Sequence, residues 1–260
     1  MKRHIITKPV GLDAFCNEIE AVCSEAHIYN QGRLRPPHLI VSLDSGSGRT
    51  TCIEYMTDMY KEHHVIKFNG LDDYIEIQLD GTPQQLKRAF VSIDRAADYT
   101  NEYTNIVGMD ISNIACHLNE TQFTDFISSI KKVCESACVV FFVHSNPSKN
   151  EEKLIEKLCS NVSKIKRIDV EPYTYENICD LIVRLIADRD TLLSNARNMS
   201  SLLMNTVKEF DICTVQEAID MVDELIHYAD YSSYMPEINE KSIKSLIENW
   251  SKSTERSEVR

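Results

Sequence analysis

Short apolar runs alternate with longer amphipathic segments through the first 170 residues of the chain. Five apolar runs have the length of a strand, at positions 38–43, 65–68, 105–110, 138–144 and 165–170. Apolar spacings of three and four, together with a capping signal, predict helices at 11–29, 49–56, 82–99, 121–134 and 151–159. The first apolar run lacks alternation, as expected of a strand buried on both faces. Strands and helices in this order predict an α/β fold with a mostly parallel sheet and helices on both faces.

The pattern changes after Pro172, where apolar residues recur at helical spacing. Four helices are predicted there, at 175–187, 192–210, 215–229 and 239–250. Thr214 and Glu217 have the spacing of a capping box at the start of the third of these helices. We therefore expect a core domain at 1–172, a small helical domain at 173–250 and a disordered polar tail at 251–260.

Candidate chemistry lies in the turn that follows the first predicted strand. Gly46 and Gly48 allow the backbone to turn tightly there, so that several N–H groups point inward in front of a helix N-terminus. Such a nest of amides binds phosphate oxygens, a basic side chain reaches the terminal phosphates, and a hydroxyl binds Mg²⁺. The predicted phosphate site comprises Ser45, Gly46, Ser47, Gly48, Arg49, Thr50 and Thr51.

This turn resembles the Walker A motif of P-loop NTPases, Gly-x-x-x-x-Gly-Lys-[Ser/Thr], with two departures. Leu43 replaces the first glycine and Arg49 replaces the lysine. Asp110, at the end of the third predicted strand, resembles the Walker B aspartate, whereas Ile111 replaces the catalytic glutamate that follows it. The resemblance implies that ATP or ADP binds at the turn, with Mg²⁺ held near Thr50 and Asp110.

The layout of the whole chain resembles that of AAA+ proteins, a family of P-loop NTPases. The resemblance implies a five-stranded parallel sheet in the order 5-1-4-3-2, followed by a small C-terminal helical lid domain. Asn146, or Ser145 beside it, then takes the sensor 1 position, Arg167 the arginine-finger position and Arg197 the sensor 2 position. Residues 10–13 resemble the first segment of the family, which lies near the adenine.

The departures from these motifs predict nucleotide binding with weak or absent hydrolysis. Arginine is bulkier than lysine and planar, and is not an equivalent replacement. Loss of the lysine and of the glutamate removes two contributions to transition-state stabilisation, although Glu102 or Glu120 could supply a carboxylate. We therefore expect a nucleotide-gated switch or assembly factor. Two alternatives stay open: an interaction module that has lost the ligand, and an active ATPase that serves DNA replication or mobile elements through a partner.

Composition narrows the expected partners and compartment. The 260-residue chain has a formal net charge of −12, which argues against direct nucleic-acid binding, so we expect self-association or protein partners. Its nine cysteines form no CxxC pair, which predicts reduced thiols in a cytoplasmic protein and no zinc site. The longest apolar run, at 137–143, is far shorter than the ~20 residues that a membrane helix needs, so we expect no membrane span.

Overall fold

The computed structural model describes most of the chain, which divides between Glu171 and Pro172 into two compact units. The described residues are 6–29, 35–68, 73–78, 91, 93, 105–114, 117–194, 198–232 and 234–257. Within these ranges, no helix combines the length and the apolar character that crossing a membrane requires.

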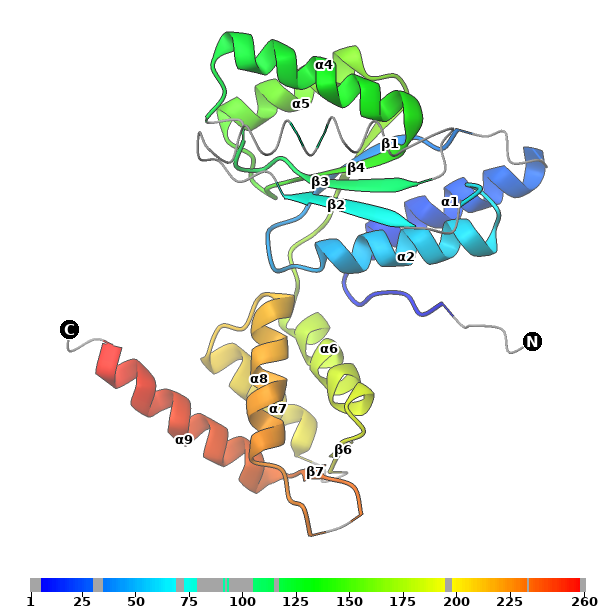
Figure 1. The fold of residues 1–260 in the computed structure, drawn as a ribbon. Helices are drawn as coiled ribbons and strands as arrows, with labels where there is room; N and C mark the ends of the chain where they lie inside the picture. Colours follow the sequence, from blue (N-terminus) through cyan, green and yellow to red (C-terminus); the bar gives the residue numbers. More distant parts are fainter. Residues whose placement is uncertain are drawn as a thin grey trace. The chain divides into compact units, whose positions relative to one another are not determined.

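Five parallel strands form the sheet of the first unit (Figure 1). Their order across the sheet is β2 (Tyr74–Gln78), β3 (Ile106–Asp110), β4 (Cys138–Val143), β1 (His38–Ser42) and β5 (Ile165–Asp169). Every neighbouring pair is parallel, which requires long crossover connections between strands rather than tight hairpins. The predicted order 5-1-4-3-2 is confirmed.

The second strand lies later in the sequence than predicted. Residues 65–68 do not form a strand; they follow the end of α2 (Arg49–Glu62). Val65 and Ile66 are apolar because they are buried where the chain leaves this helix. The strand at this edge of the sheet is β2, in which polar and apolar residues alternate and Ile77 is buried. A search for unbroken apolar runs misses such an edge strand, because only one of its faces contributes to the core.

Helices cover both faces of the sheet, as Figure 1 shows. On one face lie α1 (Asp13–Tyr29) and α2, and on the other lie α4 (Glu120–Ser136) and α5 (Lys149–Asn161). A core cluster packs the sheet against the second pair, and its fully buried members include Ile40, Val107, Met109, Phe126, Ile130, Phe141 and Leu154. Of the helix predicted at 82–99, the structure describes Val91 and Ile93, which are both helical; the rest lies outside the described residues.

The second unit contains helices and a short parallel pair of strands. The helices are α6 (Tyr175–Asp188), α7 (Met199–Glu209), α8 (Val215–His227) and α9 (Glu240–Ser257), and the strands are β6 (Leu192–Leu193) and β7 (Glu237–Ile238). The helix predicted at 192–210 begins only at Met199, because residues 192–193 pair with β7. The Thr214 hydroxyl accepts a hydrogen bond from the Glu217 amide at 3.2 Å, which completes the predicted capping box.

The C-terminal segment also differs from the expectation of a disordered tail at 251–260. Helix α9 continues beyond Trp250 as far as Ser257. The sequence after Trp250 contains no glycine or proline, so nothing in it ends the helix at that point.

Candidate functional site

The backbone of the loop between β1 and α2 has the shape that the glycines predict. Gly46 and Gly48 have φ values of 78° and 92°, in the left-handed region that favours glycine. The first hydrogen bond of α2 joins the Cys52 amide to the Gly48 carbonyl at 2.9 Å, and the helix has no side-chain cap. The amides of Arg49, Thr50 and Thr51 therefore have no partner within the helix. Amides at the positive end of a helix are suited to an anion.

The loop is fixed against the end of β4. The Leu43 amide donates to the Val143 carbonyl at 2.9 Å, and the Ser145 amide donates to Asp44 Oδ1 at 3.0 Å. Within the loop, the Ser47 amide donates to the Asp44 carbonyl at 3.2 Å. Ser145, a sensor 1 candidate, thus meets the loop through its backbone. These bonds tie the first residues of the loop to the end of β4.

The Arg49 side chain folds back onto the sheet. Its Nε donates to the Leu43 carbonyl at 2.8 Å, and its Nη1 forms an ion pair with the Asp110 carboxylate. The guanidinium carbon lies 5.7 Å from the centroid of the Phe142 ring, within the range of a cation–π contact. Only 12% of the side chain is exposed, and Nη2 is buried with no acceptor among the described residues. The basic group of the loop is therefore already engaged by the protein.

Asp110 uses both carboxylate oxygens. Oδ2 meets Arg49, and Oδ1 accepts from the Ser112 amide at 3.1 Å and from the Ser112 hydroxyl at 2.5 Å. The next residue, Ile111, has no exposed surface and belongs to the core. The position that carries a catalytic glutamate in the motif is thus an apolar core position here.

Thr50 has a partner that the sequence analysis did not identify. Its hydroxyl donates to Glu76 Oε2 on β2 at 3.4 Å. One turn further along α2, Glu54 accepts from the Tyr74 hydroxyl at 3.4 Å. The exposed edge of α2 is thus linked to the edge strand by polar contacts. The alternating pattern at 74–78 is the signal that could have located this strand and therefore Glu76.

Of the two residues predicted to hold Mg²⁺, Asp110 does not fit that ion in this arrangement. The charge of Asp110 is neutralised by Arg49, and its other oxygen accepts two hydrogen bonds from Ser112. The Thr50 hydroxyl donates to Glu76 and keeps its own lone pairs. Mg²⁺ prefers carboxylate and hydroxyl oxygens with free lone pairs, and a neighbouring cation repels it. Among the described residues, no group of three or more His, Cys, Asp or Glu side chains could hold a metal ion.

Arg167, the arginine-finger candidate, is held within its own unit. Its Nε donates to Asp169 Oδ1 at 2.9 Å, and its Nη1 lies 3.4 Å from Glu152. Asp169 Oδ1 also accepts from the Ser42 hydroxyl at 2.7 Å. The Ser42 hydrogen bond, assisted by Arg167, holds the pKa of Asp169 below its ordinary value. The guanidinium is thus tied to the edge of the sheet next to β1.

The other candidates are spread over the chain. Asn146 is exposed and has no hydrogen bond among the described residues, so the structure does not join it to the loop. Glu120 is exposed in the first turn of α4. Arg197 and Glu102 lie outside the described residues. Neither glutamate is therefore joined to Asp110 by a contact that the structure describes.

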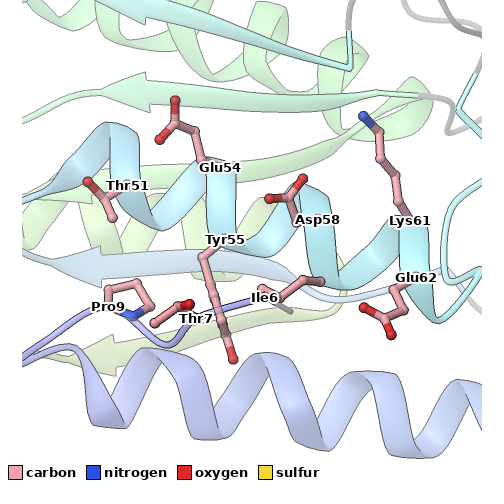
Figure 2. A pocket seen from close by; sticks show the side chains of 9 residues that line it. All are labelled: Ile6, Thr7, Pro9, Thr51, Glu54, Tyr55, Asp58, Lys61 and Glu62. Atoms are coloured by element: carbon pink, nitrogen blue, oxygen red, sulfur yellow. The ribbon is translucent and has the colours of Figure 1, made fainter. Parts of the chain in front are cut away.

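A pocket of about 580 Å³ begins beside the loop. Figure 2 shows the N-terminal segment with Ile6 and Pro9 running between α1 and α2, and the pocket opens along the side of α2. Thr51 of the loop, Glu54 and Asp58 contribute polar walls. The pocket therefore has apolar cover from the N-terminal segment and hydrogen-bond acceptors from the helix.

Comparison with known proteins identifies the fold. No family model and no curated sequence matches the chain. Among solved structures, the RuvB Holliday junction branch migration motor of Thermotoga maritima superposes with a TM-score of 0.56 at 13% identity, over 92% of this chain and 69% of that chain. Domain III of the Thermotoga maritima replication initiation protein DnaA superposes with a TM-score of 0.55 at 11% identity, over 94% of each chain. The chain therefore has the AAA+ P-loop fold that its sequence motifs predict.

Proposed function

We propose that this chain is an AAA+-like protein that binds ATP or ADP at residues 45–51 and hydrolyses ATP weakly or not at all. The observation that carries the proposal is the first turn of α2, which follows Gly48 in the left-handed conformation and has no side-chain cap. The free amides and positive end of that helix suit a phosphate group. The nucleotide state then alters partner contacts, and the protein acts as a switch or an assembly factor.

The pocket beside Thr51 supports a ligand larger than phosphate. Thr51 of the loop lines it, and the apolar side chains of Ile6 and Pro9 line its N-terminal side. Apolar cover suits a planar base, and the carboxylates of Glu54 and Asp58 suit amino and hydroxyl donors. A phosphate on the loop and a nucleoside in this pocket would together occupy adjoining surfaces of one unit.

Two features of the site oppose hydrolysis. Ile111 offers no carboxylate to polarise water and is fully buried. Arg49 is bound to Asp110 and to the Leu43 carbonyl, so it does not extend from the loop toward a terminal phosphate. Phosphoryl transfer depends on positioned charges of this kind, and their loss slows turnover more than it weakens binding.

Protein partners suit the charge of the chain better than nucleic acid does. The two similar structures are a branch migration motor and a replication initiation protein. A net charge of −12 disfavours phosphate contacts, so a role for this chain on DNA would pass through a partner or a further copy of the chain. All eight cysteines that the structure describes are free, which supports a reducing compartment such as the cytoplasm.

Calorimetry with ATP and with ADP tests the proposal directly. The exposed Ser45 offers a matched pair of variants, Ser45→Glu and Ser45→Gln, which differ in charge but hardly in size. A negative charge beside the phosphates should make Ser45→Glu bind about fivefold or more weakly than the neutral Ser45→Gln. Phosphate release should be negligible throughout. If millimolar ATP and ADP give no binding to the native chain, the proposal is rejected.

A second candidate is an interaction module that keeps the fold and binds no nucleotide. The observation that favours it is the ion pair between Arg49 and Asp110, which already satisfies the basic group of the loop. No binding of ATP or ADP to the native chain would favour this candidate over the first. Native binding that Ser45→Glu does not weaken would instead place the nucleotide away from the loop.

A further inference from the structure

The cation at the end of β3 is a side chain of the protein itself. Asp110 occupies the Walker B-like position, and the group that meets its carboxylate is the guanidinium of Arg49. We infer that Arg49 takes the place of the divalent cation, and that the loop accepts a nucleoside di- or triphosphate without a metal ion. The nucleotide part of this inference rests on the proposed function.

The contacts of Asp110 leave little capacity for a metal ion. One oxygen is paired with Arg49 and the other accepts two hydrogen bonds from Ser112. A metal ion would have to displace the guanidinium or share an oxygen with it. Displacement is opposed by the other anchors of Arg49, which are the Leu43 carbonyl at 2.8 Å and the face of the Phe142 ring.

The position of the guanidinium also excludes a second cation by charge. With 12% of its side chain exposed, Arg49 is poorly screened by water, so it repels a divalent ion near Asp110 more strongly than a surface arginine would. The same charge attracts phosphate. Nη2 is buried without an acceptor among the described residues, so in this arrangement Arg49 acts on a phosphate through its charge and not through a hydrogen bond.

The hydroxyl that would complete a metal site has a different acidic partner. Thr50 donates to Glu76 at 3.4 Å, and the side chains of both residues are exposed. The Asp110 carboxylate and the Thr50 hydroxyl, which the motif assigns to one Mg²⁺ ion, thus form two separate contacts. Asp110 pairs with Arg49, and Thr50 donates to Glu76. Glu76 supplies the control for the inference, because a metal ion held beside Thr50 would depend on its carboxylate.

The first test measures ADP binding to the full chain by calorimetry, in excess Mg²⁺ and in excess EDTA. We expect the two dissociation constants to agree within about twofold. Arg49→Lys has a shorter, more hydrated cation that frees Asp110, so this variant should gain a preference for Mg²⁺ of about fivefold or more. A tenfold or larger tightening of native binding by Mg²⁺, lost in Asp110→Asn or in Glu76→Gln, would overturn the inference.

The second test needs no nucleotide and therefore separates this inference from the proposed function. Paramagnetic resonance reports free Mn²⁺ in titrations of the native chain and of variants. We expect Asp110→Asn to leave Mn²⁺ binding by the native chain unchanged, because Arg49 already occupies that carboxylate. Arg49→Met should add one Mn²⁺ site, and adding Asp110→Asn should remove it. Loss of a native Mn²⁺ site in Asp110→Asn would overturn the inference, whether or not ADP binds.

Discussion

Arg49 and Asp110 form an ion pair that joins the first turn of α2 to the C-terminal end of β3, across 61 positions of sequence. Their side chains are 12% and 27% exposed, so the pair is shielded from most of the solvent. It ties the helix behind the loop to the strand that carries the acidic residue of the site. The position of the Arg49 guanidinium is thus set by the fold before any ligand binds.

The ion pair should contribute to the stability of the first unit. We expect Asp110→Asn to lower the free energy of unfolding of that unit by about 2–3 kcal/mol, because it leaves the largely buried guanidinium of Arg49 without a counter-charge. Urea unfolding followed by circular dichroism measures this change. The single tryptophan, Trp250, lies in the second unit and reports on that unit instead.

Glu76→Gln is the matched control for the ion pair. Glu76 is exposed and accepts one long hydrogen bond, of 3.4 Å, from Thr50. Its replacement by an amide of equal size should change the free energy of unfolding by less than about 0.5 kcal/mol. If Asp110→Asn and Glu76→Gln lower the free energy of unfolding equally, the ion pair between Arg49 and Asp110 adds no stability of its own.

The close approach of α2 to the sheet depends on Gly108 in β3. A Cβ atom at this position would lie 2.2 Å from Cδ1 and 3.2 Å from Cγ1 of Ile53, which is buried in α2. We expect Gly108→Ala to destabilise the first unit by about 1–3 kcal/mol through this overlap. Ile53→Val removes Cδ1, the atom nearest to the added Cβ. It should therefore destabilise the first unit less in the Gly108→Ala background than in the native chain. A double-mutant cycle in urea measures the coupling, and additive effects would contradict it.

Local patterns in the sequence were sufficient to predict the loop and most of the sheet. Gly46 and Gly48 act through their own backbone conformation, so their role is visible in a short stretch of sequence. The pairing of Arg49 with Asp110 could not be predicted in this way, because it depends on how α2 seats against β3. The motif assigned phosphate to Arg49 and Mg²⁺ to Asp110, whereas the fold joins the two residues to each other.

The error in the second strand has a similar physical origin. Residues 65–68 are apolar because the end of a helix is buried there, and burial alone does not distinguish a turn from a strand. Of the side chains of β2 that the structure describes, Ile77 is buried, and Glu76 contacts the edge of α2. An acidic residue of the site was missed because its strand was placed too early in the chain.

Stability should also depend on pH through His38 at the start of β1. Its side chain is 2% exposed, and its Nδ1 accepts a hydrogen bond from the Val139 amide at 3.2 Å. Burial, with a smaller contribution from Arg35, lowers the pKa of His38 from 6.5 to about 4. The unfolded chain then binds this proton more tightly than the folded chain does, so stability is lost as pH falls from about 6.5 toward 4.

His38→Asn isolates this contribution from the other acid-sensitive groups. An asparagine oxygen can replace Nδ1 as the acceptor for Val139 but does not titrate. The stability advantage of the native chain over the variant should shrink by up to about 3 kcal/mol between pH 7 and pH 4, as follows from the size of the pKa change. Urea unfolding at several pH values measures the difference, and a difference that is independent of pH would contradict the assignment.

Restoring the missing glutamate at position 111 should not by itself create an ATPase. Ile111 has no exposed surface, so Ile111→Glu places a carboxylate in the core and should destabilise the first unit by about 3 kcal/mol or more. Asn113→Glu, at an exposed position two residues further on, adds the same charge and should leave stability nearly unchanged. Thermal unfolding and phosphate release from ATP measure both effects. A stable Ile111→Glu protein with rapid phosphate release would show that the loop and Arg49 already provide every other requirement for hydrolysis.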